Sequence, residues 1–325
     1  MSPTQATNES AGDFMSRLVH ADAEVRRIAV MELPYSDEVD DIVPLLLKAL
    51  KDPDALVRAD AAKAAEGLEQ PEIVAALLQL LRDAQEETRR AAADTLAELK
   101  ESVNGPQILP FTSDADGFVT ASAFRALRAL RVPESLAPAL TALGNPSPHV
   151  RREAAGVLGY LKSPGALGPL ARVAMNDPDP EVRRVAIGAL GFATDVEVLP
   201  ALTHALSDTS WQVREEAAGT LGKLKLTGAV DHLIKSMQDG YWQVRVRAAR
   251  SLGKLKAANA LPVLIDALAH EISNLRKEAA IALGEIGDPK AIPALEATLK
   301  DPDPDVRKLT QLALKQIQQN TPPSK

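Results

Sequence analysis

The sequence has 325 residues, of which 46% are hydrophobic and only 3% aromatic, and it carries a formal net charge of −7. This composition argues against one large globular core and favours thin helices rich in Ala, Leu and Val that pack closely in layers. The acidic balance argues against nucleic acid and anionic membranes as the main partners. Because cysteine is absent, the chain by itself cannot form a disulfide, a thiolate metal site or a thiol nucleophile.

Residues 1–12, MSPTQATNESAG, are polar and lack the basic and apolar regions of an export signal. No stretch approaches the roughly 18 apolar residues that a membrane span requires. We therefore expect a cytoplasmic protein without a membrane partner. The polar ends predict short disordered tails at 1–12 and 319–325.

One repeated pair of residues, Val followed by Arg, dominates the sequence. It begins at Val25, Val57, Val150, Val182, Val213, Val244 and Val306. Close variants are Thr88-Arg89 and Leu275-Arg276, and Val119-Thr120 is a degenerate one. With these included, every step between pairs is 31 or 32 residues. Such a period is the signature of a repeat architecture, here of about ten units.

Each unit predicts two helices joined by a sharp turn, which we call helix A and helix B. In residues 167–193 a short leucine-rich helix A precedes a helix B that begins near Pro180. Asp179 is positioned to cap helix B, and Pro180 suits the first helical position because no amide hydrogen is needed there. The buried stripe of this helix B is formed by Val182, Ala186, Leu190 and Ala193. The same capping slot holds Asp54, Ser147, Ser210 and Asp303 in other units.

An acidic residue recurs six positions before the repeated Arg. It is found at Asp52, Asp83, Asp114, Asp177, Asp208, Asp239 and Asp301, with Asn145, His20 and His270 in the same slot of other units. Because both residues recur at a fixed offset, stacked repeats predict a ladder of hydrogen-bonded Arg and Asp side chains. We interpret these pairs as structural, since a pattern present in so many units is architecture rather than a catalytic site.

The order Asp, Val-Arg, Ala-Ala and Leu-Gly, as in DPDPEVRRVAIGALG and DTSWQVREEAAGTLGKL, resembles the short HEAT-like repeat named after the phycobilisome bilin lyases. The resemblance extends from about residue 13 to residue 318. It implies an all-α fold, a right-handed α-solenoid of about ten two-helix HEAT-like repeats of 31–32 residues. It implies little about function, because similar repeats occur in lyases, hydroxylases, assembly factors and adaptors.

The pattern breaks at ESVNGPQILPFTSDADGF, residues 101–118, where a leucine-rich helix A is expected. Gly105 and two prolines disfavour a helix interior there. We therefore divide the chain into amino-terminal HEAT-like repeats at 13–100, an irregular junction at 101–118 and carboxy-terminal HEAT-like repeats at 119–318. The junction is interpreted as a hinge, a partner-binding loop or a decayed repeat, and the sequence leaves these alternatives open.

No enzyme or metal site is predicted. The five histidines are scattered over different repeat positions, whereas metal ligands must converge from a few fixed ones. The deoxyhypusine hydroxylases resemble this chain in outline and bind iron through several His-Glu pairs, but only His270-Glu271 is present here. The HEAT-like DNA glycosylases use a positive face, which the acidic balance opposes. We expect no catalytic residue, no metal, no cofactor and no nucleic-acid partner.

The predicted partner-binding residues lie on the face of helix B that lines the inner curve of such solenoids. Counted from the repeated Val as one, positions three, four, seven and eleven point there. The candidate contacts are Tyr160, Phe192, Arg152, Arg184, Arg247, Arg250 and Lys254, with Gly156, Gly188 and Gly219 as a bare backbone strip beside the rings. The alternative is that Tyr160 and Phe192 pack onto the next repeat as core.

A second aromatic group comprises Trp211, Tyr241 and Trp242. The segments SWQVRE and YWQVRV place the only two tryptophans at equivalent starts of helix B, so we expect them to be neighbours at the turn edge. They either seal the seam between repeats or contact a partner.

The sequence favours a non-enzymatic scaffold, adaptor or assembly factor that grips a protein partner on its concave helical face. The alternative is one subunit of a heterodimeric bilin lyase, which attaches a phycobilin to a carrier cysteine. That alternative is supported by the repeat type and by arginines able to pair with bilin propionates. A bilin is expected as a ligand only under the alternative, and the sequence does not identify the protein partner.

Overall fold

The computed structural model describes residues 14–37, 39, 41–194 and 196–320. The tail predicted at 1–12 lies outside these residues, as does 321–325 of the carboxy-terminal tail. Gln319 and Asn320 belong to the last helix, which therefore extends past the predicted boundary at 318. The regular structure of the described residues is entirely helical, and the helices alternate in pairs, which confirms the predicted all-α solenoid.

The chain forms two compact units that divide after Leu161, and we call them unit 1 and unit 2. The helices of unit 1 are α2 (Ala23–Glu32), α3 (Val43–Ala49), α4 (Ala55–Ala64), α5 (Pro71–Leu80), α6 (Glu86–Ala97), α7 (Gly105–Ile108), α8 (Gly117–Leu130), α9 (Leu136–Ala142) and α10 (Pro148–Leu161). The helices of unit 2 are α11 (Leu167–Asn176), α12 (Pro180–Ala189), α13 (Leu199–Ala205), α14 (Trp211–Lys223), α15 (Val230–Ser236), α16 (Trp242–Lys254), α17 (Leu261–Ala267), α18 (Ser273–Ile286), α19 (Ile292–Thr298) and α20 (Pro304–Asn320). The even-numbered helices are the B helices.

Short 3₁₀ turns lead into most A helices. They are η1 (Leu33–Tyr35), η2 (Ser102–Asn104), η3 (Leu109–Ser113), η4 (Pro133–Ser135), η5 (Pro164–Ala166), η6 (Leu190–Phe192), η7 (Val196–Val198), η8 (Thr227–Ala229), η9 (Ala258–Ala260) and η10 (Pro289–Ala291). Of these, η1 and η6 follow B helices, and η3 follows α7. A 3₁₀ turn tightens the connection, so the next helix A starts directly from it.

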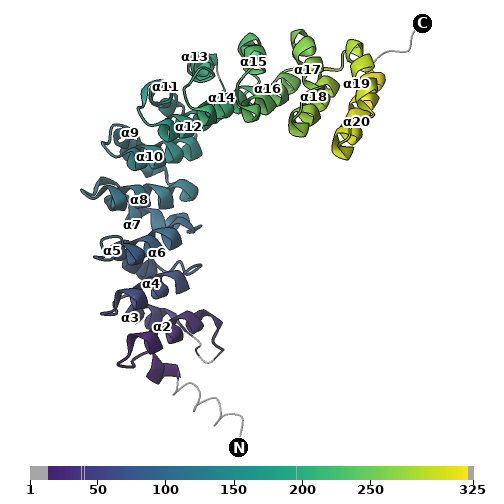
Figure 1. The fold of residues 1–325 in the computed structure, drawn as a ribbon. Helices are drawn as coiled ribbons and strands as arrows, with labels where there is room; N and C mark the ends of the chain where they lie inside the picture. The colour runs from purple at the N-terminus through teal and green to yellow at the C-terminus, as the bar shows by residue number, and fades with distance from the viewer. Residues whose placement is uncertain (1–13, 38, 40, 195, 321–325) are drawn as a thin grey trace, which may run out of the picture. The chain divides into compact units, whose positions relative to one another are not determined.

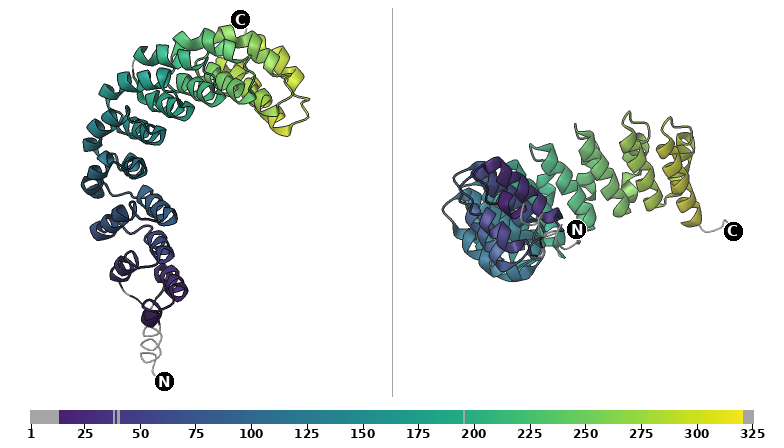
Figure 2. Two further views of the ribbon diagram at one scale, coloured as in Figure 1. Left: turned by 60° about the vertical axis from the view of Figure 1, so that its left-hand side comes forward. Right: turned by 90° about the horizontal axis from the view of Figure 1, so that it is seen from below.

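The helices of each unit form two layers. In unit 2 the B helices α14, α16, α18 and α20 pack side by side, and α13, α15, α17 and α19 form the other layer (Figure 1). In unit 1 the neighbours α2, α4, α6, α8 and α10 pack in the same way, and Figure 2 shows these layers from two further directions. The core between the layers consists mostly of buried Ala, Leu and Val, as the composition predicts.

Close packing between neighbouring B helices depends on small residues. A Cβ atom on Gly253 would lie 2.7 Å from the Cα of Ala282, and one on Gly284 would lie 2.9 Å from the Cα of Ala313. At Gly222 the obstacle is Ser251, whose hydroxyl donates across the helix interface to the carbonyl of Ala218 at 2.7 Å. These glycines are therefore needed for the approach of adjacent helix backbones.

The predicted helix caps form at the aspartates. Asp54 accepts hydrogen bonds from the amides of Leu56 and Val57, and Asp179 accepts equivalent ones from Glu181 and Val182. Ser210 holds the same slot but does not cap α14, because its hydroxyl donates to the side chain of Gln212 instead. A carboxylate in this slot also favours the positive end of the helix dipole.

Residues 101–118 are packed rather than extended. They form η2, α7 and η3, and the buried Asn104 donates from Nδ2 to the carbonyl of Glu69 at 3.1 Å. Gly105 is required here, since a Cβ atom would stand 2.3 Å from Cγ2 of Val132. The segment thus replaces a regular helix A with tight turns. The division between units 1 and 2 falls at Leu161, and the domain boundaries drawn from the sequence stay a prediction.

The Arg–Asp ladder connects each repeat to the next. Arg183 donates from Nε and Nη2 to the two oxygens of Asp208 at 2.7 and 2.8 Å, and from Nη1 to the carbonyl of Asp177 at 2.8 Å. Each guanidinium thus fastens its own A–B turn to the carboxylate of the following repeat. The same rung is formed by Arg26–Asp52, Arg58–Asp83, Arg214–Asp239 and Arg276–Asp301. The predicted ladder is confirmed at these five rungs.

The ladder carboxylates are acidified by their surroundings. Burial raises the pKa of Asp208, but the hydrogen bonds from Arg183 and the backbone amide of Ser210 outweigh it and hold that pKa below its usual value. The same balance lowers the pKa of Asp52, Asp83 and Asp239. These carboxylates are therefore ionised in the folded protein at neutral pH.

Three rungs depart from the pattern. Arg89 donates to Asp116 at 2.6 Å, and the carboxylate of Asp114 instead receives Arg82 from the end of the preceding helix A. At the degenerate repeat, Thr120 replaces the ladder Arg and its hydroxyl donates to the carbonyl of Asp114.

At the third departing rung, Nη1 of Arg245 lies 2.9 Å from Nε2 of His270. The buried Nε of Arg245 has no hydrogen-bond partner in the described part of the chain. A single imidazole nitrogen replaces two carboxylate oxygens, so this rung is under-bonded.

We expect Arg183→Ala to lower the free energy of unfolding by about 1–3 kcal/mol, because it strands the buried carboxylate of Asp208. Since the folded-state pKa of Asp208 is lowered, the rung stabilises the fold above the unfolded pKa and is lost as pH falls through the folded value. The difference between wild type and Arg183→Ala should therefore shrink below about pH 4. Urea unfolding at several pH values measures it, with the exposed Arg184→Ala as control. An equal loss from both variants would contradict a structural ladder.

We expect His270→Asp to raise the free energy of unfolding by about 1–2 kcal/mol, because Asp restores a partner for the buried Nε of Arg245. The gain should vanish when Arg245→Ala is also present, and a double-mutant cycle in urea tests this. A gain that survives without the guanidinium would mean that the stabilisation has another source.

Candidate functional site

The face of the B helices at positions three, four, seven and eleven carries the candidate residues, and we call it the B-helix face. In unit 1 the last aromatic residue of this face is Tyr160, at the end of α10. The Tyr160 side chain is 47% exposed. The guanidinium carbon of Arg128 lies 5.9 Å from the centre of its ring. Tyr160 is therefore held from one side by a cation and open to solvent on the other.

Arg152, on the same helix, is held by a buried acid. Its Nη2 donates to Oε1 of Glu153 at 2.8 Å, and Arg128 donates to Oε2 of the same carboxylate at 3.4 Å. Glu153 is only 6% exposed, so it fixes both guanidiniums at the surface. Arg128 also lies over Gly156, with its Cδ 3.2 Å from the place of a Cβ atom. The expected bare backbone strip is therefore wrong here, because a neighbouring side chain covers it.

Arg152 also lines a cavity of about 370 Å³ between α6, α8 and α10. Its floor includes Ala93, Phe118 and Ala121, and two more arginines lie at its rim. Ser122, 6% exposed, lines the same cavity, and its hydroxyl makes no hydrogen bond within the described residues. Apolar walls with a few polar groups are typical of a recognition pocket.

In unit 2 the arginines of the B-helix face are held in ion pairs at the surface. Arg184 contacts Glu181 at 2.9 Å, and Arg247 contacts Glu215 at 3.1 Å. Arg250 pairs with Glu278 on the adjacent helix. The three arginine side chains are 37–44% exposed. The pairs of Arg184 and Arg247 are therefore partly solvated and weak, whereas Arg250 binds a buried carboxylate.

Lysines and an aromatic ring complete this face of unit 2. A cavity of about 260 Å³ is lined by Lys223, Lys254 and Arg247, among others. Neither lysine has an ion-pair partner among the residues that the structure describes. Phe192 lies at the end of η6 and is half-buried. It is therefore neither fully exposed, as a partner contact would be, nor fully buried, as a core residue would be. At Gly188 the strip is again covered, here by Glu216.

The second aromatic group forms a stack across two repeats. Trp211 and Tyr241 lie with ring centres 5.5 Å apart at an interplanar angle of 14°, and Arg214 lies 5.6 Å from the centre of the Tyr241 ring. The stacking partner of Trp211 is thus Tyr241, whereas the sequence suggested the equivalent Trp242. Tyr241 is 48% exposed, so the stack has an open outer side.

The unit 2 candidates form two separate groups. Trp242 is the first residue of α16 and Lys254 the last, so about 18 Å of helix separates them. Arg250 and Lys254 belong to the carboxy-terminal half, while the Trp211–Tyr241 stack lies at the amino-terminal edge. The structure therefore does not bring all the candidates of this unit together.

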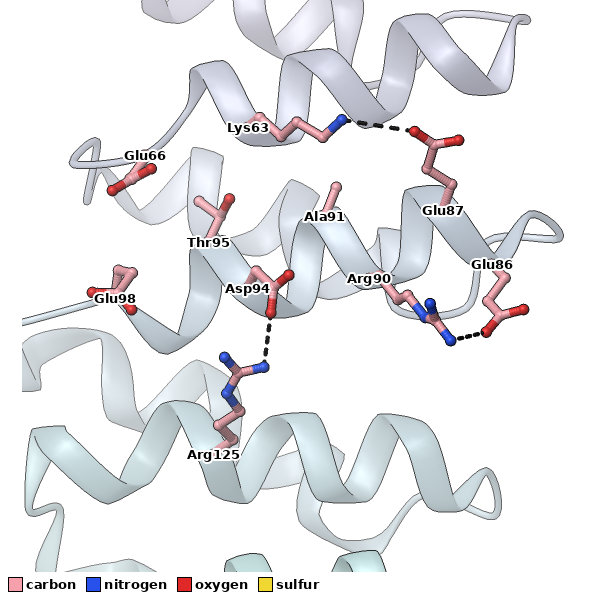
Figure 3. A pocket seen from close by; sticks show the side chains of 10 residues that line it. All are labelled: Lys63, Glu66, Glu86, Glu87, Arg90, Ala91, Asp94, Thr95, Glu98 and Arg125. Carbon is pink, nitrogen blue, oxygen red and sulfur yellow. Dashed lines mark hydrogen bonds and ion pairs between the residues drawn. The ribbon is translucent and has the colours of Figure 1, made fainter.

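Sequence reasoning missed a groove in unit 1, of about 820 Å³, drawn in Figure 3. It lies between α4, α6 and α8, and Lys63, Arg90 and Arg125 each make an ion pair in or beside it. Glu66 and Glu98 make none within the described residues. The sequence did contain a signal for this groove. In the third repeat, Asp94 and Glu98 occupy positions seven and eleven of helix B, which are positions of the B-helix face.

The same count also finds Tyr35, which the sequence analysis left out. Tyr35 occupies position eleven of the first repeat, as Tyr160 does in the fifth, and it is 87% exposed. Met31, at position seven, is exposed as well. Aromatic and methionine side chains in the open are characteristic of contact surfaces.

The described residues show no sign of other site chemistry. Within them, no three His, Asp or Glu side chains are grouped as metal ligands. Among the same residues, no helix has the length and apolarity needed to cross a membrane.

Comparison with known proteins identifies the repeat. A family model described as HEAT repeats matches residues 13–97, 43–128, 105–174, 169–242 and 230–315. Comparison with curated proteins finds no match.

Solved structures share the fold at low identity. Importin beta aligns over 95% of this chain with a TM-score of 0.63 and 14% identity, and Kap95p, in a structure with RanGDP, over 98% with 0.64 and 15%. This chain covers 50% and 51% of those two, about half of their length. Escherichia coli YibA aligns over 92% of this chain and 98% of its own, with a TM-score of 0.56 and 19% identity. At these identities the likeness shows the fold alone.

We expect Tyr160→Ala to lower the free energy of unfolding by less than about 1 kcal/mol, because the ring is open to solvent. Phe192→Ala should cost about 1–3 kcal/mol, and the fully buried Phe124→Ala about 3–5 kcal/mol. Urea unfolding of the three variants measures this order. A loss at Tyr160 as large as at Phe124 would show that the ring belongs to the core.

Proposed function

The chain belongs to the HEAT repeat family, and from this premise we propose that it is a non-enzymatic scaffold that grips a protein partner on its B-helix face. Stacked helical repeats form a wide, semi-rigid surface that suits a macromolecular partner better than a small substrate. Two similar solved structures are of Kap95p with RanGDP and with Nup1, which are protein complexes. A cytoplasmic location belongs to the proposal.

The exposure of the tyrosines is the observation that carries the proposal. The chain has three tyrosines, and Tyr35, Tyr160 and Tyr241 are 87%, 47% and 48% exposed. In a chain with 3% aromatic residues, leaving every tyrosine in the open is not explained by core packing. Tyrosine is among the residues that contribute most to protein interfaces.

Two arginines of the B-helix face are suited to exchange partners. Arg184 and Arg247 each bind a carboxylate of their own unit in a partly solvated pair. Such pairs contribute only about 0–1 kcal/mol, so replacing the internal carboxylate by one from a partner is inexpensive. The proposed contacts are Tyr160, Phe192, Arg152, Arg184, Trp211, Tyr241, Trp242, Arg247, Arg250 and Lys254.

We expect partner capture to depend on the B-helix face. The immobilised full chain would be exposed to host extract, captured proteins identified by quantitative mass spectrometry, and the best candidate purified and titrated. Arg152→Glu with Tyr160→Ala should weaken its binding at least about tenfold, since exposed aromatic and Arg anchors typically contribute more than 1.4 kcal/mol.

The matched control is Arg172→Glu, an exposed arginine on helix A of unit 2. It should leave both capture and affinity unchanged. Equal loss from the control, or a partner indifferent to all these changes, would contradict the proposed surface. Capture of a phycobiliprotein or a bilin would favour the bilin-lyase alternative instead.

A further inference from the structure

An exposed apolar cluster lies at the amino-terminal end of the B-helix face. It consists of Ile28 and Met31 on α2 and Tyr35 in η1, all exposed to solvent. Met31 and Tyr35 line two adjoining cavities, of about 420 and 680 Å³. An apolar surface of this kind is costly to leave in water and is typical of a docking site.

This cluster is continuous with the groove of Figure 3. The cavity of about 680 Å³ is also lined by Lys63 and Glu66, and both residues line the groove of about 820 Å³ as well. The combined surface runs from α2 across α4 to α6. Neighbouring helices pack about 8–10 Å apart, so this path is about 20 Å long and matches a helix of about 13 residues.

The charges along this path are unbalanced. The two cavities are lined by six acidic residues, Asp60, Glu66, Glu86, Glu87, Asp94 and Glu98, and three basic ones, Lys63, Arg90 and Arg125. Each of the three cations is already paired, Lys63 with Asp60 at 3.2 Å, Arg125 with Asp94 at 2.8 Å, and Arg90 with Glu86. Asp60 is also bound by Arg27 of α2 at 2.9 Å, so it is neutralised from outside the two cavities.

Two carboxylates along the path are left over. The side chains of Glu66 and Glu98 have no ion-pair or hydrogen-bond partner within the described residues, and they stand at equivalent ends of α4 and α6 (Figure 3). A ligand that lies along the path therefore gains from positive charge beside Glu66 and Glu98 and from apolar side chains at Tyr35.

The chain's own amino terminus does not fit this description. Residues 1–13, MSPTQATNESAGD, contain no Lys or Arg and two carboxylates. Placing them on the path would add negative charge to an acidic surface. A separate, cationic occupant is required.

We propose that unit 1 binds a basic amphipathic helix of the partner protein, with its apolar stripe on Met31 and Tyr35 and its Lys or Arg side chains at Glu66 and Glu98. This proposal rests on the scaffold function and specifies the chemistry of the partner in unit 1.

The test uses the full chain and three labelled synthetic helical peptides of about 15 residues. All share one stripe of Leu and Phe, and their remaining positions are Lys, Gln or Glu. Fluorescence anisotropy should show the Lys peptide binding at least tenfold more tightly than the Gln peptide, with an affinity that falls as salt rises. The Glu peptide should show no binding that depends on Glu66, Glu98 or Tyr35.

Variants locate the binding. Glu66→Gln with Glu98→Gln should weaken the Lys peptide at least tenfold, flatten its salt dependence and leave the melting temperature unchanged, since both side chains are exposed and unpaired. Tyr35→Ala should weaken the Lys and Gln peptides alike. The control is Glu72→Gln with Glu101→Gln, two exposed carboxylates outside both cavities, which should change nothing.

Several outcomes would overturn the proposal. One is equal binding of the three peptides, and another is an equal loss of affinity for the Lys peptide in the control pair. A third is a tenfold gain in affinity for the Lys peptide when residues 1–12 are replaced by a Gly-Ser stretch, because the tail would then be the occupant. Dimerisation abolished by Tyr35→Asp, seen by sedimentation, would make a second copy the occupant. If these peptides fail while a captured partner still depends on Arg152 and Tyr160, this proposal falls and the scaffold function stands.

Discussion

The guanidinium of each ladder arginine is held from two sides, by carbonyl oxygens of its own A–B turn and by a carboxylate of the next repeat. Arg214, for example, donates to the carbonyl of Asp208 and to both oxygens of Asp239. A repeat protein has few long-range contacts, so its cooperativity depends on such links between neighbours. Because all three guanidinium nitrogens and both carboxylate oxygens of this rung are hydrogen-bonded, the cost of burying the charges is offset within the rung itself. Among the described rungs of unit 2, the contact of Arg245 with His270 is the one that leaves a buried guanidinium nitrogen without a partner.

Close packing of the B helices explains why the aromatic residues are found at the surface. Adjacent backbones approach so nearly at Gly253 and Gly284 that a single Cβ atom would not fit. Large rings therefore have little room in these interfaces. The two buried rings lie elsewhere: Phe14 precedes α2, and Phe124 lies in α8, beside the irregular α7. Rings placed on the B-helix face or at the turn edge stay partly open. The constraint that builds the core thus also supplies the exposed tyrosines on which the proposed interaction surface is based.

The net charge of −7 conceals different local balances in the two units. In unit 1 the cations of the groove are consumed in internal pairs, and Glu66 and Glu98 remain. In unit 2 the arginines are likewise paired, but Lys223 and Lys254 remain, again among the described residues. A surface with spare carboxylates and a surface with spare ammonium groups select different partner segments, because complementary charge determines specificity and encounter rate more than total affinity. Under the proposed function, each unit therefore offers a partner a surface with its own chemistry.

The amino-acid sequence by itself determined the period, the pairing of helices and the place of the caps, because each of these depends on interactions within one repeat. Asp179 caps α12 through amides two and three residues away, and Val182 and Ala186 share a face through helical geometry alone. The ladder could also be foreseen, since a repeated offset becomes a repeated contact once units stack. Only the tertiary structure decided that Arg183 takes the carboxylate 25 residues later, that Trp211 stacks on Tyr241 and that Glu66 is left without a cation. In each case several side chains on adjacent helices could make the contact. Which of them makes it depends on the distances between the helices, and a local sequence pattern does not contain those distances.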